Sequence, residues 1–249
     1  MTHLLSKSKY IRGLQCERAL WLDVHEPRLA RYTAEQMRRF DRGRDFEYAF
    51  KSRFPDGIDL SAELKRNVDL YPARTAALLD DVETRRAASQ EDSRRDTSRL
   101  YRMVLFEAGF QYDDVLVLAD VVGQREDGSL DIYEVKSGTT LSDTYRRDAA
   151  LQHYVISHCR RIHSFSIVYN GGNGASGFNG QDGPFAIVDL TEELAAEGDR
   201  IAANIAGMKT IVRATAEPDT PTGQHCLSPY ACPYQHYCQQ GVRQLALFG

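Results

Sequence analysis

The chain has 249 residues, of which 42% are hydrophobic and 27% are charged, so it is long enough to bury a substantial core. A net charge of −4 argues against a protein coated with positive charge, and no apolar run reaches the roughly 20 residues that a membrane span needs. The N-terminal residues also lack the apolar core of a secretory signal. We therefore expect a cytoplasmic protein without a membrane partner, whose five cysteines stay reduced.

Basic residues are concentrated at the N-terminal end. The first 53 residues hold twelve Lys or Arg against seven Asp or Glu, a local balance of +5 that leaves −9 for the rest. Such a distribution suits contact with a phosphate backbone, although solvated helix faces explain any single cluster equally well. Ser6 is placed to cap a short helix, and Thr33 with Gln36 forms a capping box for a helix to about Phe50. Pro72 suits the first turn of another helix.

The centre of the chain changes to a strand-like pattern. Three runs rich in Val, Leu, Ile and aromatics are separated by turn residues, which predicts an antiparallel meander over 102–112, 115–124 and 130–138. A helix from about Ser142 to Cys159, two further strands and a helix capped by Thr191 follow. We therefore predict one α/β domain over residues 1–249, with a mixed sheet flanked by helices. Residues 89–98 and 171–184 are predicted to be flexible loops.

Two acidic residues and one lysine lie on two of these strands. Glu134 and Lys136 are two positions apart, so they share one sheet face while Val135 takes the other. Hairpin pairing brings Asp120 opposite roughly position 134 or 136. Burying two carboxylates and an ammonium together is costly unless a hard cation such as Mg²⁺ or Mn²⁺ pairs with them. A salt-bridged hairpin surface is the alternative for this spacing.

Other polar residues accompany this group. Gln152 and Tyr154 lie on the helix that follows, where a polar pair can reach the mouth of a site. Upstream, Gly43 is followed four positions later by Glu47, another carboxylate on a helix. Glu107, on the first strand of the meander, is a competing acidic neighbour that we rank below Glu47 as a metal ligand.

The order of Asp120, then Glu134-Val135-Lys136 on a paired strand, then a helix with Gln and Tyr resembles the RecB-like branch of the PD-(D/E)XK nuclease superfamily. The resemblance implies a restriction-endonuclease-like core. It implies that Asp120, Glu134 and the carbonyl of Val135 bind Mg²⁺ or Mn²⁺, and that Lys136 is the catalytic lysine.

The same resemblance assigns the flanking residues. Gln152 would join the catalytic set and, with Tyr154, contact DNA. Glu47 stands where the family's Gly-x-x-x-His motif has a histidine that binds metal, and glutamate can ligate the same ion.

Three cysteines close the chain at even spacing in the stretch HCLSPYACPYQHYC. Five residues separate Cys226 from Cys232 and Cys232 from Cys238, and the fourth candidate, Cys16, lies 209 residues away. Thiolates bind zinc or iron–sulfur clusters, and zinc modules usually have shorter knuckles. A site with this layout would clamp the two chain ends together.

Three nearby side chains bear on this site. His225 and His236 flank the late cysteines, and either could replace one thiolate in a zinc site. Cys159 falls in the predicted core helix and is expected to pack as a small buried residue.

The cysteine layout resembles the iron–sulfur clasp of RecB-like nucleases, including the CRISPR adaptation nuclease. It is most similar to a bacterial family of this branch that carries KSKYIRGLQCERALWL, IYEVKSG and CLSPYACPYQHYC. The resemblance implies a structural 4Fe-4S cluster, with zinc as the alternative, and a clasp formed by 1–30 and 220–240. Its ligands would be Cys16, Cys226, Cys232 and Cys238.

Together these features predict a metal-dependent DNA nuclease, most similar to exonucleases that act on single strands or DNA ends. The alternative is a nucleic-acid-binding subunit of a larger DNA-processing complex, with a helicase or other protein in trans. A hydrolase of RNA or small molecules on the same metal site is a third hypothesis.

Overall fold

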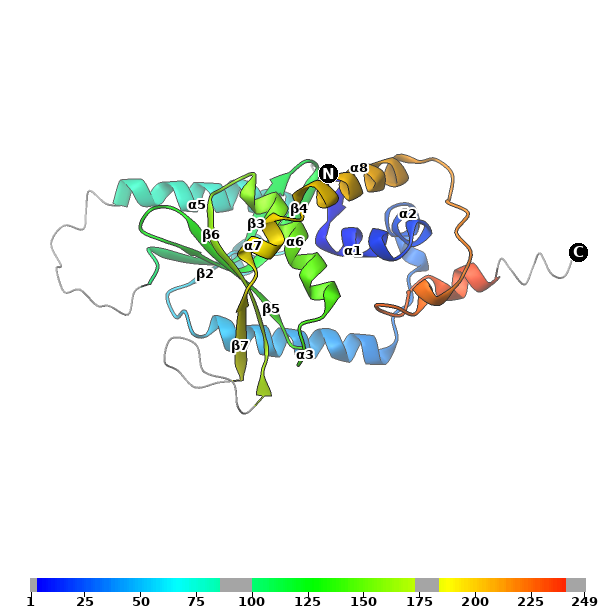
Figure 1. Ribbon diagram of the computed structural model, residues 1–249, viewed down its shortest axis with the longest axis horizontal. Coiled ribbons are helices and arrows are strands. Elements are labelled where there is room, and N and C mark those ends of the chain that lie inside the picture. The colour runs from blue at the N-terminus through cyan, green and yellow to red at the C-terminus, as the bar shows by residue number, and fades with distance from the viewer. Residues whose placement is uncertain (1–3, 86–99, 173–183, 241–249) are drawn as a thin grey trace, which may run out of the picture.

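The computed structural model describes residues 4–85, 100–172 and 184–240, so the loop predicted at 89–98 and most of that at 171–184 lie outside the described residues. Seven strands form one sheet in the order β2-β3-β4-β5-β6-β7, with β1 pairing to β4 (Figure 1). The strands are β1 (Leu5–Ser6), β2 (Ile58–Asp59), β3 (Met103–Tyr112), β4 (Val115–Gln124), β5 (Leu130–Lys136), β6 (Ile162–Asn170) and β7 (Phe185–Asp189).

The strand directions confirm a mixed sheet. β3, β4 and β5 form the predicted antiparallel meander. Asp113 and Asp114 make the first turn with φ of 50° and 60°, and Gly128 has φ of 78° in the second, as tight hairpin turns require. β5 pairs with β6 in parallel through a helical crossover, and β7 returns antiparallel to β6.

The helices follow the predicted capping signals for the most part. Ser6 accepts a hydrogen bond from the Lys9 N–H, Thr33 and Gln36 form a complete capping box, and Ser142 caps the core helix. The α-helices are α1 (Lys7–Gln15), α2 (Glu17–His25), α3 (Ala34–Lys51), α4 (Leu60–Leu64), α5 (Tyr71–Arg85), α6 (Asp143–Ser157), α7 (Thr191–Ala195) and α8 (Gly198–Arg213). Short 3₁₀ turns are η1 (Pro27–Leu29), η2 (Val68–Leu70) and η4 (Gln224–Cys226).

The prediction of one helix capped by Thr191 is wrong. The segment forms two helices, α7 and α8, and Thr191 is the first residue of α7 rather than its cap. Its hydroxyl donates to the Asp189 carboxylate and accepts from the Phe165 N–H, so it ties the helix to the sheet. Gly198, a poor helix former, stands at the start of the second helix.

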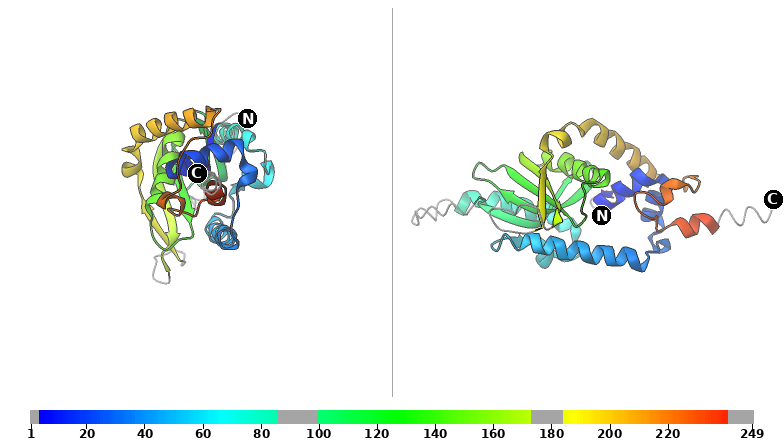
Figure 2. Two further views of the ribbon diagram at one scale, coloured as in Figure 1. Left: turned by 90° about the vertical axis from the view of Figure 1, so that its right-hand side faces the viewer. Right: turned by 60° about the horizontal axis from the view of Figure 1, so that its bottom comes forward.

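Two hydrophobic clusters lie on the two faces of the sheet. The larger contains residues of α5, α6 and α8 together with strand residues such as Val117 and Ile132. The smaller contains Phe50 of α3 with Val121 and Tyr133. Figure 2 shows α3 running along one side of the sheet, opposite α6 and α8. The sheet is therefore covered on both faces, and polar residues within it need partners.

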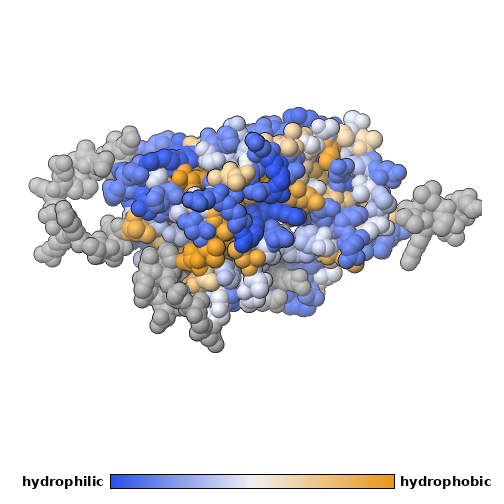
Figure 3. All heavy atoms as spheres, viewed as in Figure 1, coloured by the Kyte–Doolittle hydropathy of each residue, from blue (hydrophilic) through white to orange (hydrophobic). Residues whose placement is uncertain are grey.

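Most side chains on the face of the molecule that Figure 3 shows are hydrophilic. Hydrophobic side chains gather beside the edge strand β7, where Ile187 is 36% exposed. β7 has only five residues, which limits the edge open to pairing with another chain. None of the helices in the described ranges combines the length and the apolar character that crossing a membrane requires.

The N-terminal helices pack against the C-terminal segment, residues 214–240. The indole Nε1 of Trp21 donates to the Ala214 carbonyl over 2.9 Å, and the Tyr234 hydroxyl donates to Asp23 over 2.5 Å. Figure 1 shows this segment beside α2. The chain ends therefore meet as the sequence predicts, through hydrogen bonds and packing, while a metal cluster between them stays a prediction.

Candidate functional site

β4 and β5 separate at the position of the predicted site. Their backbone pairing ends at Val121 and Tyr133. Continuing the register places Asp120 opposite Glu134, as the sequence predicts. Here the Asp120 side chain replaces the backbone ladder, because its Oδ2 accepts the Val135 N–H over 2.7 Å. A fork between the two strands therefore opens at these two carboxylates.

The strands next to the fork are irregular. Ala119 and Val122 both lie in the larger hydrophobic cluster although they are three positions apart, so the alternation of faces shifts at Asp120. Glu107 stands opposite Asp120 in the register of β3 and β4 and has φ of 55°, in the left-handed region. Such a conformation costs a non-glycine residue about 1–3 kcal/mol and is typical of functional sites. The distortion takes both carboxylates out of the regular pattern.

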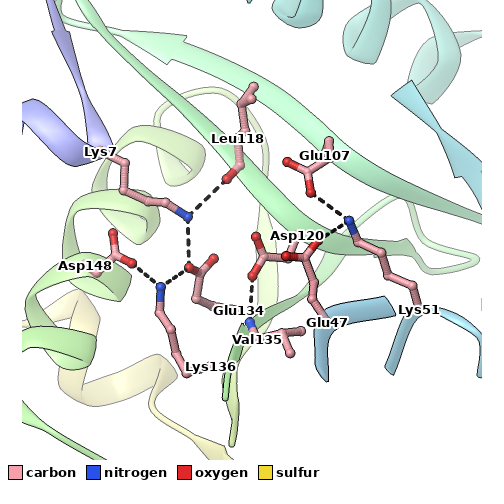
Figure 4. Close-up of polar contacts among 10 residues, drawn as sticks. All are labelled: Lys7, Glu47, Lys51, Glu107, Leu118, Asp120, Glu134, Val135, Lys136 and Asp148. Atoms are coloured by element: carbon pink, nitrogen blue, oxygen red, sulfur yellow. Dashed lines mark hydrogen bonds and ion pairs between the residues drawn. The ribbon is translucent and has the colours of Figure 1, made fainter. Parts of the chain in front are cut away.

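Three carboxylates converge at this distortion. Oxygen atoms of Glu47, Glu107 and Asp120, here called the carboxylate triad, lie within 4.8 Å of one another. Lys51, one helical turn after Glu47, pairs with Glu47 and contacts the Glu107 Oε1 at 2.7 Å (Figure 4). When all three carboxylates are ionised, three negative charges and one positive charge leave −2 at this place. One divalent cation would neutralise it.

Burial is the main cause of the raised pKa values in the triad, and neighbouring negative charges add to it. Burial raises the pKa of Asp120 well above its ordinary value, and the charge of Glu134 adds to the rise. Burial also raises the pKa of Glu107 to about 7, with Lys51 opposing the rise and Glu47 adding to it. A bound cation would reverse these shifts by favouring the ionised carboxylates.

A second group, here called the lysine cluster, consists of Lys7, Glu134, Lys136 and Asp148. Glu134 is fully buried, and its Oε1 accepts hydrogen bonds from Lys7 Nζ at 2.8 Å and from Lys136 Nζ at 2.5 Å. Lys136 also donates to Asp148 of α6 at 2.5 Å. Burial alone would raise the pKa of Glu134, but Lys136 and Lys7 outweigh it and hold that pKa well below the ordinary value. The cluster is neutral, with two charges of each sign.

Several buried polar atoms beside the lysine cluster have no hydrogen-bond partner among the described residues. They are Glu134 Oε2, Asp148 Oδ1 and both amide atoms of Gln152. Figure 4 shows the second carboxylate oxygen of Glu134 on the side that faces Asp120. Because buried polar groups are rarely left unpaired, these atoms indicate a missing ligand, ion or water.

The predicted site residues divide into those that meet and one that does not. Asp120, Glu134 and Lys136 gather at the fork, and Gln152 lies one helical turn from Asp148 on the buried side of α6. The structure does not bring Tyr154 to them. Two positions beyond Gln152, it points about 200° away around the helix. Its ring packs instead against those of Tyr112 and His158, with centroids 5.8 Å and 4.6 Å away.

Glu107, which the sequence analysis ranks below Glu47 as a metal ligand, lies beside it, and the sequence analysis does not name three of the partners. Glu107 belongs to the triad together with Glu47, whereas Glu134 does not. Lys51 was detectable as the i+4 partner of Glu47, and Asp148 as the residue one turn before Gln152. Lys7 gave no local signal, because 127 positions separate it from the carboxylate that it contacts.

A cavity of about 690 Å³ opens beside the lysine cluster, with residues of α1, α3, α6 and the C-terminal segment around it. The Gln15 side chain donates to the carbonyls of His225 and Tyr230, both at 2.7 Å, and so fixes one wall. The lining residues are Lys7, Ser8, Ile11, Arg12, Gln15, Tyr32, Thr33, Glu35, Gln36, Lys136, Thr144, Tyr145, Asp148, Tyr230 and Ala231.

The four predicted cysteine ligands are free thiols. Cys16, Cys232 and Cys238 contribute to the same small hydrophobic cluster. Burial raises the pKa of these three thiols, and neighbouring thiols, including Cys226, add to the rise. Cys159 lies apart, with its thiol 3.5 Å from the Gln111 carbonyl.

The sulfur atoms are not at zinc spacing. Among the described residues, the carboxylate triad is the only group of three or more possible ligand atoms within 4.8 Å of one another. A tetrahedral zinc with bonds of about 2.3 Å would hold its sulfurs about 3.8 Å apart. The cysteines therefore lie near one another without forming a finished metal site, and their cofactor stays a prediction.

Comparisons with known proteins add little. No protein-family model matches the sequence, and no curated protein matches it. A solved structure described as "Crystal structure of SSO0001" is similar with a TM-score of 0.34 and 9% sequence identity, over 95% of this chain and 85% of that one. A TM-score of this size carries no argument about function.

Proposed function

We propose that the chain is a Mg²⁺- or Mn²⁺-dependent deoxyribonuclease that hydrolyses phosphodiester bonds, with single-stranded DNA or DNA ends as its substrate. The observation that carries the proposal is the fork between β4 and β5. There a triad of carboxylates, with a charge of −2 beside Lys51 when all three are ionised, lies next to a buried glutamate and lysine, beside a cavity.

The triad suits a hard divalent cation in charge and in ligand type. Mg²⁺ and Mn²⁺ prefer carboxylate oxygens and retain waters or take substrate phosphate at their other positions. Glu47, Glu107 and Asp120 would hold the ion, and the unpartnered Oε2 of Glu134 faces the same place. When bound, the ion would stabilise the charge that develops on the phosphate and lower the pKa of a bound water.

The lysine cluster supplies the protein's own part of the chemistry. Lys136 lines the cavity, and burial together with Asp148 and Glu134 fixes its environment. Burial would lower the pKa of Lys136, but Asp148 and Glu134 outweigh it and raise that pKa well above the ordinary value. Lys136 therefore remains an ammonium, which would orient the attacking water or contact the scissile phosphate by hydrogen bonds.

A second function has one observation in its favour. Lys51 already pairs with two carboxylates of the triad, and Glu134 already pairs with two lysines. Such a network can persist without a metal, as it would in a nucleic-acid-binding subunit that keeps the fold but does not cut.

One assay separates the two functions. Labelled single-stranded DNA is incubated with Mn²⁺ or Mg²⁺ and the wild type, Asp120→Asn or Lys136→Ala. Asp127→Asn, which removes a surface partner of Arg161, is the matched control. If the protein is a nuclease, the wild type and the control variant should cut the DNA, whereas the two site variants should not. Binding by the wild type without any cutting would favour the subunit.

For the cysteines we propose a structural 4Fe-4S cluster held by Cys16, Cys226, Cys232 and Cys238, with zinc as the alternative. Anaerobic purification of the wild type should give a brown protein that contains iron. Cys232→Ser should lose the colour and some stability, whereas Cys159→Ser, remote from the other thiols, should keep both. A colourless wild type with one zinc per chain would reverse the assignment.

A further inference from the structure

The N-terminal segment inserts a lysine into the fork between β4 and β5. β1 pairs in parallel with Val115 and Leu116, the part of β4 that β5 does not cover. Ser6 ends β1 and caps α1, so Lys7 is the first residue of the helix. Its Nζ lies 2.8 Å from Glu134 Oε1 and 3.5 Å from the Leu118 carbonyl. The chain thus delivers a second ammonium to the site from outside the strand meander.

The placement of this ammonium, rather than its charge, points to a ligand. Lys7 and Lys136 together balance the charges of Glu134 and Asp148. Lys7 contacts the same oxygen as Lys136, although Oε2 has no partner among the described residues. Both ammonium groups therefore stand on the side of Glu134 that borders the cavity, and both residues line it.

Lys7 also retains a donor for a ligand. An ammonium has three N–H groups, and the two contacts of Lys7 use two of them. Its side chain is 27% exposed where it lines the cavity. The first turn of α1 holds no acidic residue, so the positive end of the helix dipole adds to the charge of Lys7. This end of the cavity is suited to an anion.

The remaining wall suits a nucleic-acid strand. Tyr32 and Tyr230 line the same cavity and are 47% and 43% exposed. Aromatic faces beside a positively charged groove are the usual surface on which single-stranded bases stack. A phosphate beside the two lysines and a base against a tyrosine are the contacts of one nucleotide strand.

We propose that Lys7 binds a phosphate of single-stranded DNA in this cavity, next to the phosphate that Lys136 contacts. The proposal rests on the proposed nuclease function. It makes the N-terminal segment part of the substrate site, so that β1 and α1 carry a substrate contact as well as a place in the fold.

The test measures the salt dependence of DNA binding. A fluorescent single-stranded oligonucleotide is titrated with Asp120→Asn protein in EDTA, where binding should occur without cleavage, at several NaCl concentrations. Each phosphate contact to a single strand contributes about 0.7 to the slope of log K against log salt. Adding Lys7→Gln should weaken binding and reduce the slope by about 0.7, whereas Lys7→Arg should keep the slope.

Lys9→Gln is the matched control, because it removes the same charge from the same helical turn but from a residue that does not line the cavity. It should leave the slope unchanged. Urea unfolding of each variant checks that the fold is retained. A Lys7→Gln slope equal to that of Lys9→Gln would overturn the proposal while leaving the nuclease function intact. A wild type that neither cuts nor binds DNA would overturn both.

Discussion

The carboxylate triad and the lysine cluster lie side by side at one fork, yet they differ in charge. With every group ionised, the triad and Lys51 would carry −2, whereas the lysine cluster would be neutral. Burial is the main cause that raises the pKa of Glu107 to about 7, whereas two ammonium groups outweigh burial at Glu134 and hold its pKa well below its ordinary value. Two glutamates on strands of the same sheet thus lie in opposite electrostatic surroundings. Under the proposed function, Glu107 would bind the cation and Glu134 would position the ammonium of Lys136.

The largest expected effect is the difference between two single variants, each of which removes one ammonium from one half. Lys136→Met should reduce DNA cleavage by at least about 100-fold, because the group that orients the water or phosphate is lost. Lys51→Met should keep cleavage within about tenfold of wild type, because a divalent cation can take over the neutralisation of the triad. Single-turnover cleavage with saturating Mn²⁺ measures both. Equal losses would mean that the two halves do not have separate tasks.

The next effect concerns the metal itself. Asp120→Asn should weaken Mn²⁺ binding at least about tenfold, since it removes one of three charged ligands. Asp148→Asn changes a buried carboxylate of the lysine cluster in the same way. It should leave the Mn²⁺ affinity within about twofold of the wild-type value. Isothermal titration with Mn²⁺ gives both constants without any DNA. If Asp148→Asn has the larger effect, the cation binds in the lysine cluster instead.

Glu107 of the triad and Glu134 of the lysine cluster should also respond oppositely to pH in the metal-free protein. The pKa of Glu107 is raised from 4.5 to about 7, so its contribution to stability is present below pH 4.5 and is lost as the pH rises to 7. The loss is about 3 kcal/mol at most. The depressed pKa of Glu134 gives a contribution that is present above 4.5 and is lost only in strong acid.

Urea unfolding between pH 4 and 8 measures this difference. Glu107→Gln should flatten the decline between pH 4.5 and 7, and Mn²⁺ should remove the decline in the wild type. A wild type whose stability rises over this range would contradict the charge excess assigned to the triad.

The sequence predicted the strands, their meander and the placing of Asp120 opposite position 134 or 136, because these follow from a period of two and from turn residues next to one another in the chain. It underestimated Glu107 for a physical reason. The alternation that assigns each strand residue to a face fails at a residue with positive φ, and no residue type near Glu107 announces that conformation.

Contacts across long separations were also beyond prediction. Lys7 reaches the site only because β1 fills the part of β4 that β5 leaves open, and that depends on where the β4–β5 pairing ends. The family resemblance pairs Tyr154 with Gln152 as a DNA contact, although two positions along a helix point to different sides. Local pattern thus predicted the framework of the site better than the residues that complete it.

The smallest effect tests whether the backbone at position 107 is strained to build the triad. Glu107→Ala and Glu107→Gly both remove the carboxylate, so both should lose Mn²⁺ affinity equally. They differ in the left-handed conformation at φ of 55°, which glycine adopts freely and alanine does not. Glycine in a strand interior normally lowers stability, but here Glu107→Gly should be more stable than Glu107→Ala by about 1 kcal/mol. Urea unfolding of the metal-free variants at pH 5 measures the difference. An alanine variant equal to or more stable than the glycine variant would mean that the distortion relaxes once the carboxylate is gone. The triad, rather than the strand, would then be what holds position 107 in its unusual conformation.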